Sequence, residues 1–215
     1  MSGALQAIFQ NQRSFAPPPP SVIGEAYGGG YYAGQISTAG NGVADYYLIV
    51  GPDATAQGNY QWKTTRTTTT GTTSVIDGPA NSTAMNNASH PGAQFCKALT
   101  VGGFTDWYMP AKNELEICYY NLKYDTTANN TSSGINPNAV PARASNYTSG
   151  DPTQTTATIF RIGNSETFGA SSYWSSTEFS AKYAYNQRFL NGKQYSTYPY
   201  KTSSKPTRAV RRIAV

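Results

Sequence analysis

A long polar stretch, residues 124–172, carries almost no periodic apolar signal, and it limits the folds that are open to this chain. Without regularly spaced apolar side chains, neither an amphipathic helix nor a half-buried strand is expected there. Loops of this length inside a compact domain are usually functional or partly disordered. We therefore expect a long insertion loop within a fold whose turns and loops outweigh its regular elements.

The composition supports a loop-rich α+β fold that has its own core. Of the 215 residues, 38% are hydrophobic and 13% are charged, and Gly, Pro and Tyr number 20, 13 and 17. Glycine and proline favour turns, whereas tyrosine favours strands. A chain of this length can bury a sizeable core, so we expect one domain, or one domain with an arm.

Consecutive prolines at residues 17–20 mark a boundary near the beginning of the chain. Prolines cannot continue a helix or join a strand ladder, and they favour a stiff, extended spacer. The chain is therefore divided into an N-terminal arm and spacer at 1–20, a β-hairpin-rich region at 21–74 and a larger domain at 75–215. No apolar run is long enough to span a bilayer, and we expect no signal peptide because a basic segment followed by an apolar one is missing.

Strand signals dominate the region before residue 75. Residues 31–36 and 45–52 are predicted to be two strands joined by a turn at Asn41 and Gly42, whose positive φ angles would suit a tight hairpin. The glycine-rich run before them does not match the GxGxxG pattern, and no nucleotide site is expected. The Thr-rich run at 62–79 predicts an exposed loop or an irregular strand.

Near-helical spacing of apolar residues predicts two helices, over 81–99 and over 110–123. Pro91 either kinks the first helix or begins its second half, where a missing N–H costs little. On the second helix, Glu114 and Glu116 point in different directions, so we expect structural or surface carboxylates rather than a paired acid and base.

The residue types that commonly bind metals or perform catalysis are few. Cys96 and Cys118 fit neither a disulfide framework nor a zinc cluster, so buried free thiols are expected, with one bridge between the helices as the alternative. His90 is the only histidine, and we expect a structural or exposed role for it. Neither a Gly-x-Ser-x-Gly elbow, a Cys–His partnership nor a metal triad is apparent, so we expect no enzyme activity, metal or cofactor.

Positive charge gathers at the end of the chain, whose formal net charge is +5. One interpretation is a solvated final strand, and the other is attraction to an anionic surface such as lipopolysaccharide or acidic glycan. No basic helix or nucleic-acid motif accompanies the charge, so no nucleic-acid partner is expected. The basic residues concerned are Lys201, Lys205, Arg208, Arg211 and Arg212.

Residues 173–201 combine many tyrosines with Asn, Ser, Gln and Lys, and residues 191–193 predict a tight turn between two strands. Tyrosine offers a large amphipathic contact surface at low entropy cost, and Ser and Asn add adaptable hydrogen bonds. The structural alternative is that these tyrosines pack over a thin sheet. Strand alternation leaves open which face points outward. The candidate ligand-binding residues are Tyr183, Tyr185, Asn186, Arg188, Asn191, Lys193, Tyr195, Tyr198 and Tyr200.

Three segments, taken together and in this order, resemble the DUF1566 or Lcl C-terminal domain family. They are GGFTDWYMPAKNELEICYYNLK, SSYWSSTEFSAKYAYNQRF and the closing TRAVRRI. The resemblance covers about residues 75–215 and implies a C-type-lectin-like fold, in which two helices flank a small irregular antiparallel sheet with long loops. It also implies that Trp107, Trp174 and residues 175–178 belong to the scaffold. We therefore expect buried tryptophans and a Glu178 that pairs with backbone donors or with an arginine such as Arg211.

The preceding segments SVIGEAYGGGYYAGQI and DYYLIVGP are similar to the region that precedes this domain in many phage tail-fibre and related virion proteins. The resemblance implies a bacteriophage virion protein, made in the host cytoplasm, that binds a host cell-surface glycan or protein as a tail fibre or tail tip. We expect the N-terminal arm to contact other virion proteins, the assembly to be a homotrimer and no membrane insertion. The alternatives are a structural virion component such as a head-decoration protein, or a bacterial surface adhesin that binds anionic glycans.

Overall fold

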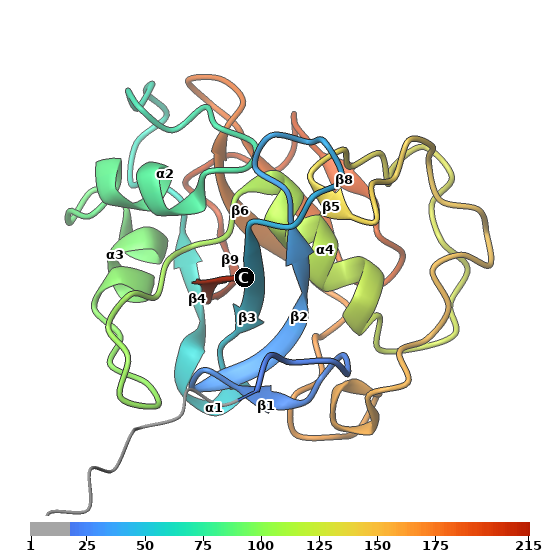
Figure 1. Cartoon of the computed structure of the whole chain (residues 1–215). Helices are drawn as coiled ribbons and strands as arrows, with labels where there is room; N and C mark the ends of the chain where they lie inside the picture. Colours follow the sequence, from blue (N-terminus) through green and yellow to red (C-terminus); the bar gives the residue numbers. More distant parts are fainter. Residues whose placement is uncertain (1–17) are drawn as a thin grey trace, which may run out of the picture.

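The computed structural model describes residues 18–215 and shows a mixed α+β fold in which helices lie beside several small antiparallel sheets (Figure 1). Most of the predicted arm, residues 1–17, lies outside the described residues. No helix within residues 18–215 has both the length and the apolar character needed to cross a bilayer.

The central sheet joins the beginning of the described chain to its end. Its strand order is β1–β2–β3–β10, and β5 pairs with β2 at one end. Because the last strand lies beside β3, strands from both sides of residue 75 share this sheet. The strands are β1 (Ala26–Tyr27), β2 (Gly30–Ile36), β3 (Tyr46–Val50), β5 (Ala139–Val140) and β10 (Val210–Ala214).

Two smaller antiparallel sheets complete the strand pairing. One joins β4 to β9, and the other has the order β6–β7–β8. The predicted turn at 191–193 is confirmed, since it links β7 to β8 and Gly192 has a φ of 73°. These strands are β4 (Gln57–Gln61), β6 (Ser172–Glu178), β7 (Ala184–Arg188), β8 (Gln194–Tyr195) and β9 (Ser204–Arg208).

The helices lie close to the predicted ranges, except that the range 81–99 holds parts of two separate helices rather than one. Pro91 occupies the first turn of its helix, so the alternative in which it begins a second half is confirmed. The helix predicted at 110–123 is also confirmed, and Glu114 accepts a hydrogen bond from the Ala111 N–H at its start (2.7 Å). The helices are α1 (Asp53–Ala56), α2 (Gly78–Ala84), α3 (Pro91–Lys97) and α4 (Lys112–Leu122).

The predicted hairpin of β2 and β3 is present, but its turn differs from the prediction. Positive φ angles occur at Gly40 (65°) and Gly42 (81°), and no residue other than glycine has one in the described chain. The expectation of a positive φ at Asn41 is therefore wrong. Its side-chain oxygen instead accepts hydrogen bonds from the Ser37 hydroxyl (2.9 Å) and the Val43 N–H (3.0 Å), which closes the loop locally.

Two clusters of buried side chains form the core, and the tryptophans lie in or beside them. Trp62, Trp107 and Trp174 are fully buried, which confirms the expectation for the two that belong to the resemblance. Cys96 lies in the cluster with the tryptophans, and Cys118, on the helix at 112–122, lies in the other cluster. Both thiols are free and buried, and burial raises the pKa of each.

The long segment at 124–171 is irregular apart from β5 and one short 3-10 turn, as predicted. Buried asparagines hold it together with a few buried aromatic side chains, Tyr147, Phe160 and Phe168. Asn129 donates to the Pro152 carbonyl (2.9 Å), Asn136 to the Asn113 carbonyl (2.8 Å) and Asn138 to the Ser37 carbonyl (2.8 Å). Because these amides satisfy backbone groups that would otherwise be buried without partners, the segment packs without a periodic pattern.

Glu116 on α4 is the charged centre of the same segment. Its carboxylate is fully buried, forms an ion pair with Arg143 and accepts hydrogen bonds from the Tyr147 hydroxyl (2.6 Å) and the Asn136 amide. Of the two roles expected for Glu114 and Glu116, the structural one is therefore correct. Both carboxylates are inside the protein rather than on its surface.

Candidate recognition surface

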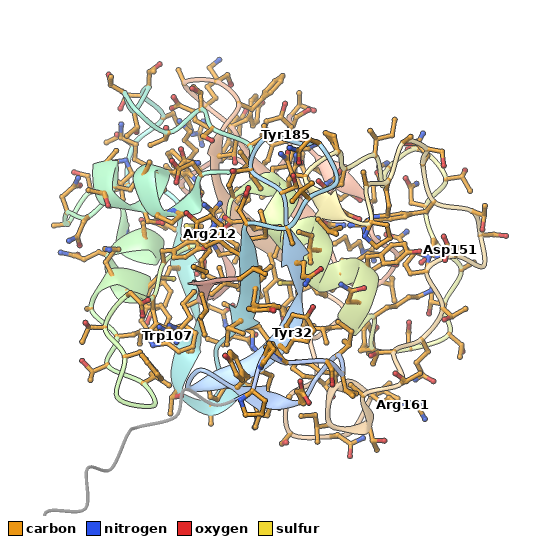
Figure 2. All side chains as sticks on the ribbon, viewed as in Figure 1. Tyr32, Trp107, Asp151, Arg161, Tyr185 and Arg212 are labelled. Carbon is orange, nitrogen blue, oxygen red and sulfur yellow. The ribbon has the colours of Figure 1, made fainter. Side chains whose placement is uncertain are left out.

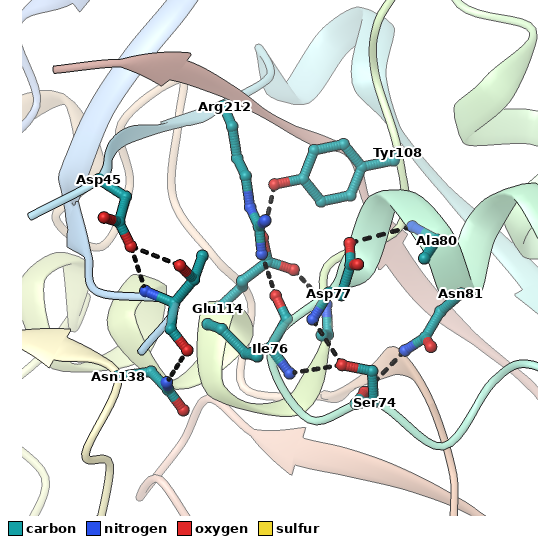
Figure 3. Close-up of polar contacts among 12 residues, drawn as sticks. Asp45, Ser74, Ile76, Asp77, Ala80, Asn81, Tyr108, Glu114, Asn138 and Arg212 are labelled. Atoms are coloured by element: carbon teal, nitrogen blue, oxygen red, sulfur yellow. Dashed lines mark hydrogen bonds and ion pairs between the residues drawn. The ribbon is translucent and has the colours of Figure 1, made fainter. Parts of the chain in front are cut away.

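The arginines at the end of the chain connect the last strands to carboxylates elsewhere in the fold. Arg208 pairs with Glu166, Arg211 with Asp106 and Arg212 with Glu114. Figure 3 shows Arg212 between Glu114 and the Ile76 carbonyl, with the Tyr108 hydroxyl bonded to the same carboxylate (2.5 Å). These ion pairs therefore connect β9 and β10 to other parts of the domain.

The basic residues at the end of the chain are neither a solvated strand nor a free cationic patch. Arg208, Arg211 and Lys201 are 1%, 6% and 0% exposed, and each makes an ion pair, because a buried charge is stable only with a partner. Arg212 is half-buried and also makes an ion pair, whereas Lys205 is half-buried and makes none within residues 18–215. For most of these basic residues, therefore, neither the solvated final strand nor the attraction to an anionic surface is the correct interpretation.

Glu178 has a different partner from the one expected. It is buried, forms an ion pair with Lys201 and accepts a hydrogen bond from the Thr69 N–H (2.9 Å). The expectation of a backbone donor is confirmed, whereas Arg211 as its partner is wrong. The Thr-rich run forms a loop, the first of its two predicted alternatives, and it contacts both members of this ion pair.

His90 lies buried in structural contacts next to this loop. Its ring nitrogens contact the Thr69 hydroxyl and the Asn87 side-chain oxygen, both at 2.9 Å. Burial, followed by the positive charges of Lys63 and Lys201, lowers the pKa of His90 to about 4.

The pKa shift of His90 predicts a loss of stability in mild acid. A histidine in the unfolded chain takes up its proton near pH 6.5, whereas the folded state resists protonation down to about pH 4. The contribution is present in full above pH 6.5, and it should decrease by about 2 kcal/mol as the pH falls through this window. Urea denaturation across pH 4–7 measures it, and His90→Gln should flatten that part of the curve. Identical pH profiles for the two proteins would contradict the assignment.

The structure places the nine predicted contact residues in three environments. Tyr198 and Tyr200 are exposed, by 69% and 38%, on the chain between β8 and β9. Asn186 is 2% exposed and donates its side-chain amide to the Tyr198 carbonyl (2.8 Å), so it supports this loop and is removed from the contact set. The other six are half-buried: Tyr183, Tyr185, Arg188, Asn191, Lys193 and Tyr195.

Both faces of β7 are covered, which explains why alternation could not identify the outer set. Asn186 and Gln187 are each 2% exposed, although neighbouring residues of a strand point to opposite faces. The tyrosines reach solvent at the strand's beginning instead. Figure 2 shows Tyr185 at the upper end of the molecule, whereas Arg212 lies near the middle.

One part of the surface is a column of stacked side chains, which we call the tyrosine stack. The rings of Tyr183 and Tyr200 lie parallel, with centroids 5.1 Å apart and an interplanar angle of 13°. The guanidinium of Arg66 lies 3.7 Å from the centre of the Tyr200 ring. Beside it, exposed Phe179 packs edge-on against Tyr185. The stack thus presents flat aromatic and cationic groups together.

The second part is an open hollow of about 380 Å³, which we call the cationic hollow. Arg188 and Lys205 bring positive charge to it, and no carboxylate is among its lining residues. It is lined by Ala170, Ser171, Ser172, Arg188, Tyr195, Tyr198 and Lys205. Such a lining can pair with an anionic group and pack against a flat apolar face.

Sequence reasoning missed the contribution of other segments to this surface. Arg66, Lys112 and Phe179 all touch it, although none was a candidate, and Lys205, which was predicted only as part of the basic C-terminal cluster, lines it. One feature of the sequence could have indicated Arg66, because it is the single arginine within the run of threonines. Residues 18–215 contain no group of three or more His, Cys, Asp or Glu side chains placed to hold a metal ion.

Comparison with known proteins gives a family and no individual relative. The model of the Lcl C-terminal domain matches residues 56–211. That range takes in the Thr-rich loop, both helices that were predicted from periodicity and the tyrosine stack. No curated protein and no solved structure matches the chain.

Proposed function

Because the chain belongs to the Lcl C-terminal domain family, we propose that it is a non-enzymatic recognition module that attaches a bacteriophage to its host. In this proposal the chain is part of a tail fibre or tail tip and binds a glycan or protein of the host cell surface. The binding groups are the tyrosine stack and the residues around the cationic hollow.

The observation that carries the proposal is the exposure of Tyr198 and Tyr200 on a firmly held loop. Exposed aromatic side chains that are grouped together, as here, mark contact sites more often than single exposed residues do, and tyrosine loses little entropy when it binds. Asn186 bonds the Tyr198 carbonyl from below, and the Lys201 ammonium is bound in the interior immediately after Tyr200. The rings are therefore presented by a preorganised backbone, which favours binding.

The fold is proposed to be a variant of the C-type lectin fold. Helix α4 packs against β2, the sheets are small and antiparallel, and long loops connect them, as the resemblance leads us to expect. The virion context is part of the proposal as well. It assigns contacts with other virion proteins to the N-terminal arm and a homotrimer to the assembly.

The proposal is tested by replacing Tyr195, Tyr198 and Tyr200 together with alanine. Loss of central aromatic contacts is worth about 2 kcal/mol or more, so particles carrying the variant should adsorb to host cells at least about 30-fold more weakly. A matched control replaces three exposed apolar residues elsewhere, Val43, Ile135 and Ile162, with alanine and should adsorb normally. Unchanged adsorption by intact particles of the tyrosine variant would argue against the proposal.

A second candidate function is adhesion to anionic glycans, and the cationic hollow favours it. Arg188 and Lys205 make no ion pair within residues 18–215, which leaves both cations available to an anion. Retention on a sulfated polysaccharide column should then fall as salt rises, and Arg188→Gln should elute earlier than the parent. Retention that does not respond to salt would rule out charge as the driving force.

A further inference from the structure

The Thr-rich loop at residues 64–72 is held from below by a buried lysine. Lys63 is 8% exposed, and its ammonium donates to the carbonyls of Thr67 (3.2 Å) and Thr68 (2.9 Å) and to the Thr69 hydroxyl (2.9 Å). The ammonium makes no ion pair with a carboxylate in the described chain. The oxygens of the loop are therefore the main hydrogen-bond partners of the Lys63 ammonium. Because a buried charge needs such partners, the ammonium holds these loop residues close to it.

A second buried lysine reaches the same loop from the C-terminal region. Lys201 is fully buried, donates to the Thr67 carbonyl (3.2 Å) and pairs with Glu178, which also accepts the Thr69 N–H. Both ammoniums thus meet at one carbonyl. Most side chains of the loop are exposed, so polar contacts rather than a buried apolar face hold its backbone.

The contacts of this loop place Arg66 on the tyrosine stack. Arg66 is exposed, lies over the Tyr200 ring and makes no ion pair within residues 18–215. Tyr200 immediately precedes Lys201, so the same buried ammonium fixes the backbone on both sides of the arginine–tyrosine contact. In Figure 1 the loop between β4 and α2 and the segment after β6 lie at the same end of the molecule.

We propose that the Thr-rich loop is part of the partner-binding surface, with Arg66 as a contact residue and with Lys63 and Lys201 as positioning residues. The planar guanidinium stacks on Tyr200 through its face, which leaves its edge of N–H donors for an anionic oxygen of the partner. This inference rests on the proposed function, because it extends the same surface to a segment distant in sequence.

Lys63→Met is the variant that tests the positioning role. It removes the ammonium without leaving an unpaired carboxylate, whereas a change at Lys201 would leave Glu178 buried alone. Amide hydrogen exchange of a peptide spanning residues 64–72 should become at least about tenfold faster, since loop carbonyls lose their donors. The matched control is Lys205→Met, a lysine with no bond to the loop, which should leave exchange there unchanged. Unchanged exchange in Lys63→Met would overturn the positioning role.

Binding of purified protein to host cells then tests the contact role. Arg66→Ala, on the exposed surface, should weaken binding about tenfold, and Lys63→Met should weaken it to a similar degree. If Lys63 acts through Arg66, the double variant binds no more weakly than Arg66→Ala alone. Normal binding by Arg66→Ala, while the triple tyrosine variant still fails to bind, would overturn this inference and leave the proposed function intact. Normal binding by both would overturn the two together.

Discussion

Replacing Glu166 with glutamine is expected to lower the free energy of unfolding by about 3 kcal/mol, because the buried guanidinium of Arg208 then keeps only the more distant, partly exposed carboxylate of Asp53 (3.8 Å) as a counter-charge. Arg208 is 1% exposed and donates to the carbonyls of Gly51 (2.9 Å) and Glu166 (2.8 Å) as well as to the Glu166 carboxylate. Its guanidinium also lies 4.6 Å from the centre of the Phe168 ring. The loss should appear in urea denaturation at neutral pH.

Asp106→Asn is the matched control for this variant. The pair of Asp106 with Arg211 has the same chemistry, and the Arg211 side chain is also mostly buried (8% exposed), but the Asp106 side chain is 53% exposed, so solvent reaches the pair and screens the interaction. Its removal should cost at most about 1 kcal/mol. Equal losses for the two amide substitutions would show that burial does not decide the strength of these ion pairs, contrary to the present interpretation.

Replacing Glu116 with glutamine is expected to have the second large effect, a loss of about 3 kcal/mol or more. The carboxylate is fully buried and serves Arg143, Tyr147 and Asn136, all of which belong to the long irregular segment. Tyr147 in turn accepts a hydrogen bond from Gln187 on β7 (3.2 Å). Amide exchange over residues 124–152 should therefore accelerate more than exchange in the central sheet.

Asp151→Asn controls for a charge change on that segment. Asp151 is exposed and accepts only the Tyr120 hydroxyl among the side chains described (3.1 and 3.3 Å), so its amide variant should lose less than about 1 kcal/mol. If Glu116→Gln leaves the exchange of residues 124–152 at the parent rate, the carboxylate does not organise the segment as inferred.

Much of the regular structure could be predicted from the sequence, because it follows from local patterns. The β2–β3 hairpin, the helix that begins at Pro91 and the helix α4 all come from apolar periodicity and proline positions. The partners of charged residues could not be predicted in this way. Glu178, at the end of β6, bonds with Lys201 rather than Arg211 because the segment between β8 and β9, and not the final strand, brings a cation to it.

The candidate surface was predictable only in part, for a similar reason. A stretch rich in tyrosine indicated the correct region, and Tyr198 and Tyr200 are exposed. The alternation of residues along β7 did not remove Asn186 from the predicted contact residues, because both faces of this strand are covered. The usual contrast between a buried face and a solvated face is therefore absent. Arg66 joins the surface through contacts between residues far apart in the sequence, which no local pattern records.

The most direct test of the central claim compares two single substitutions in one loop, Tyr198→Ala and Asn186→Ala, by host-cell binding and by thermal unfolding. Tyr198 is exposed and Asn186 supports its carbonyl from the interior. The account predicts that Tyr198→Ala keeps the parent melting temperature and binds at least about tenfold more weakly, whereas Asn186→Ala also melts several degrees lower. Parent-like binding by a folded Tyr198→Ala protein would contradict the claim that the exposed tyrosines form the recognition surface.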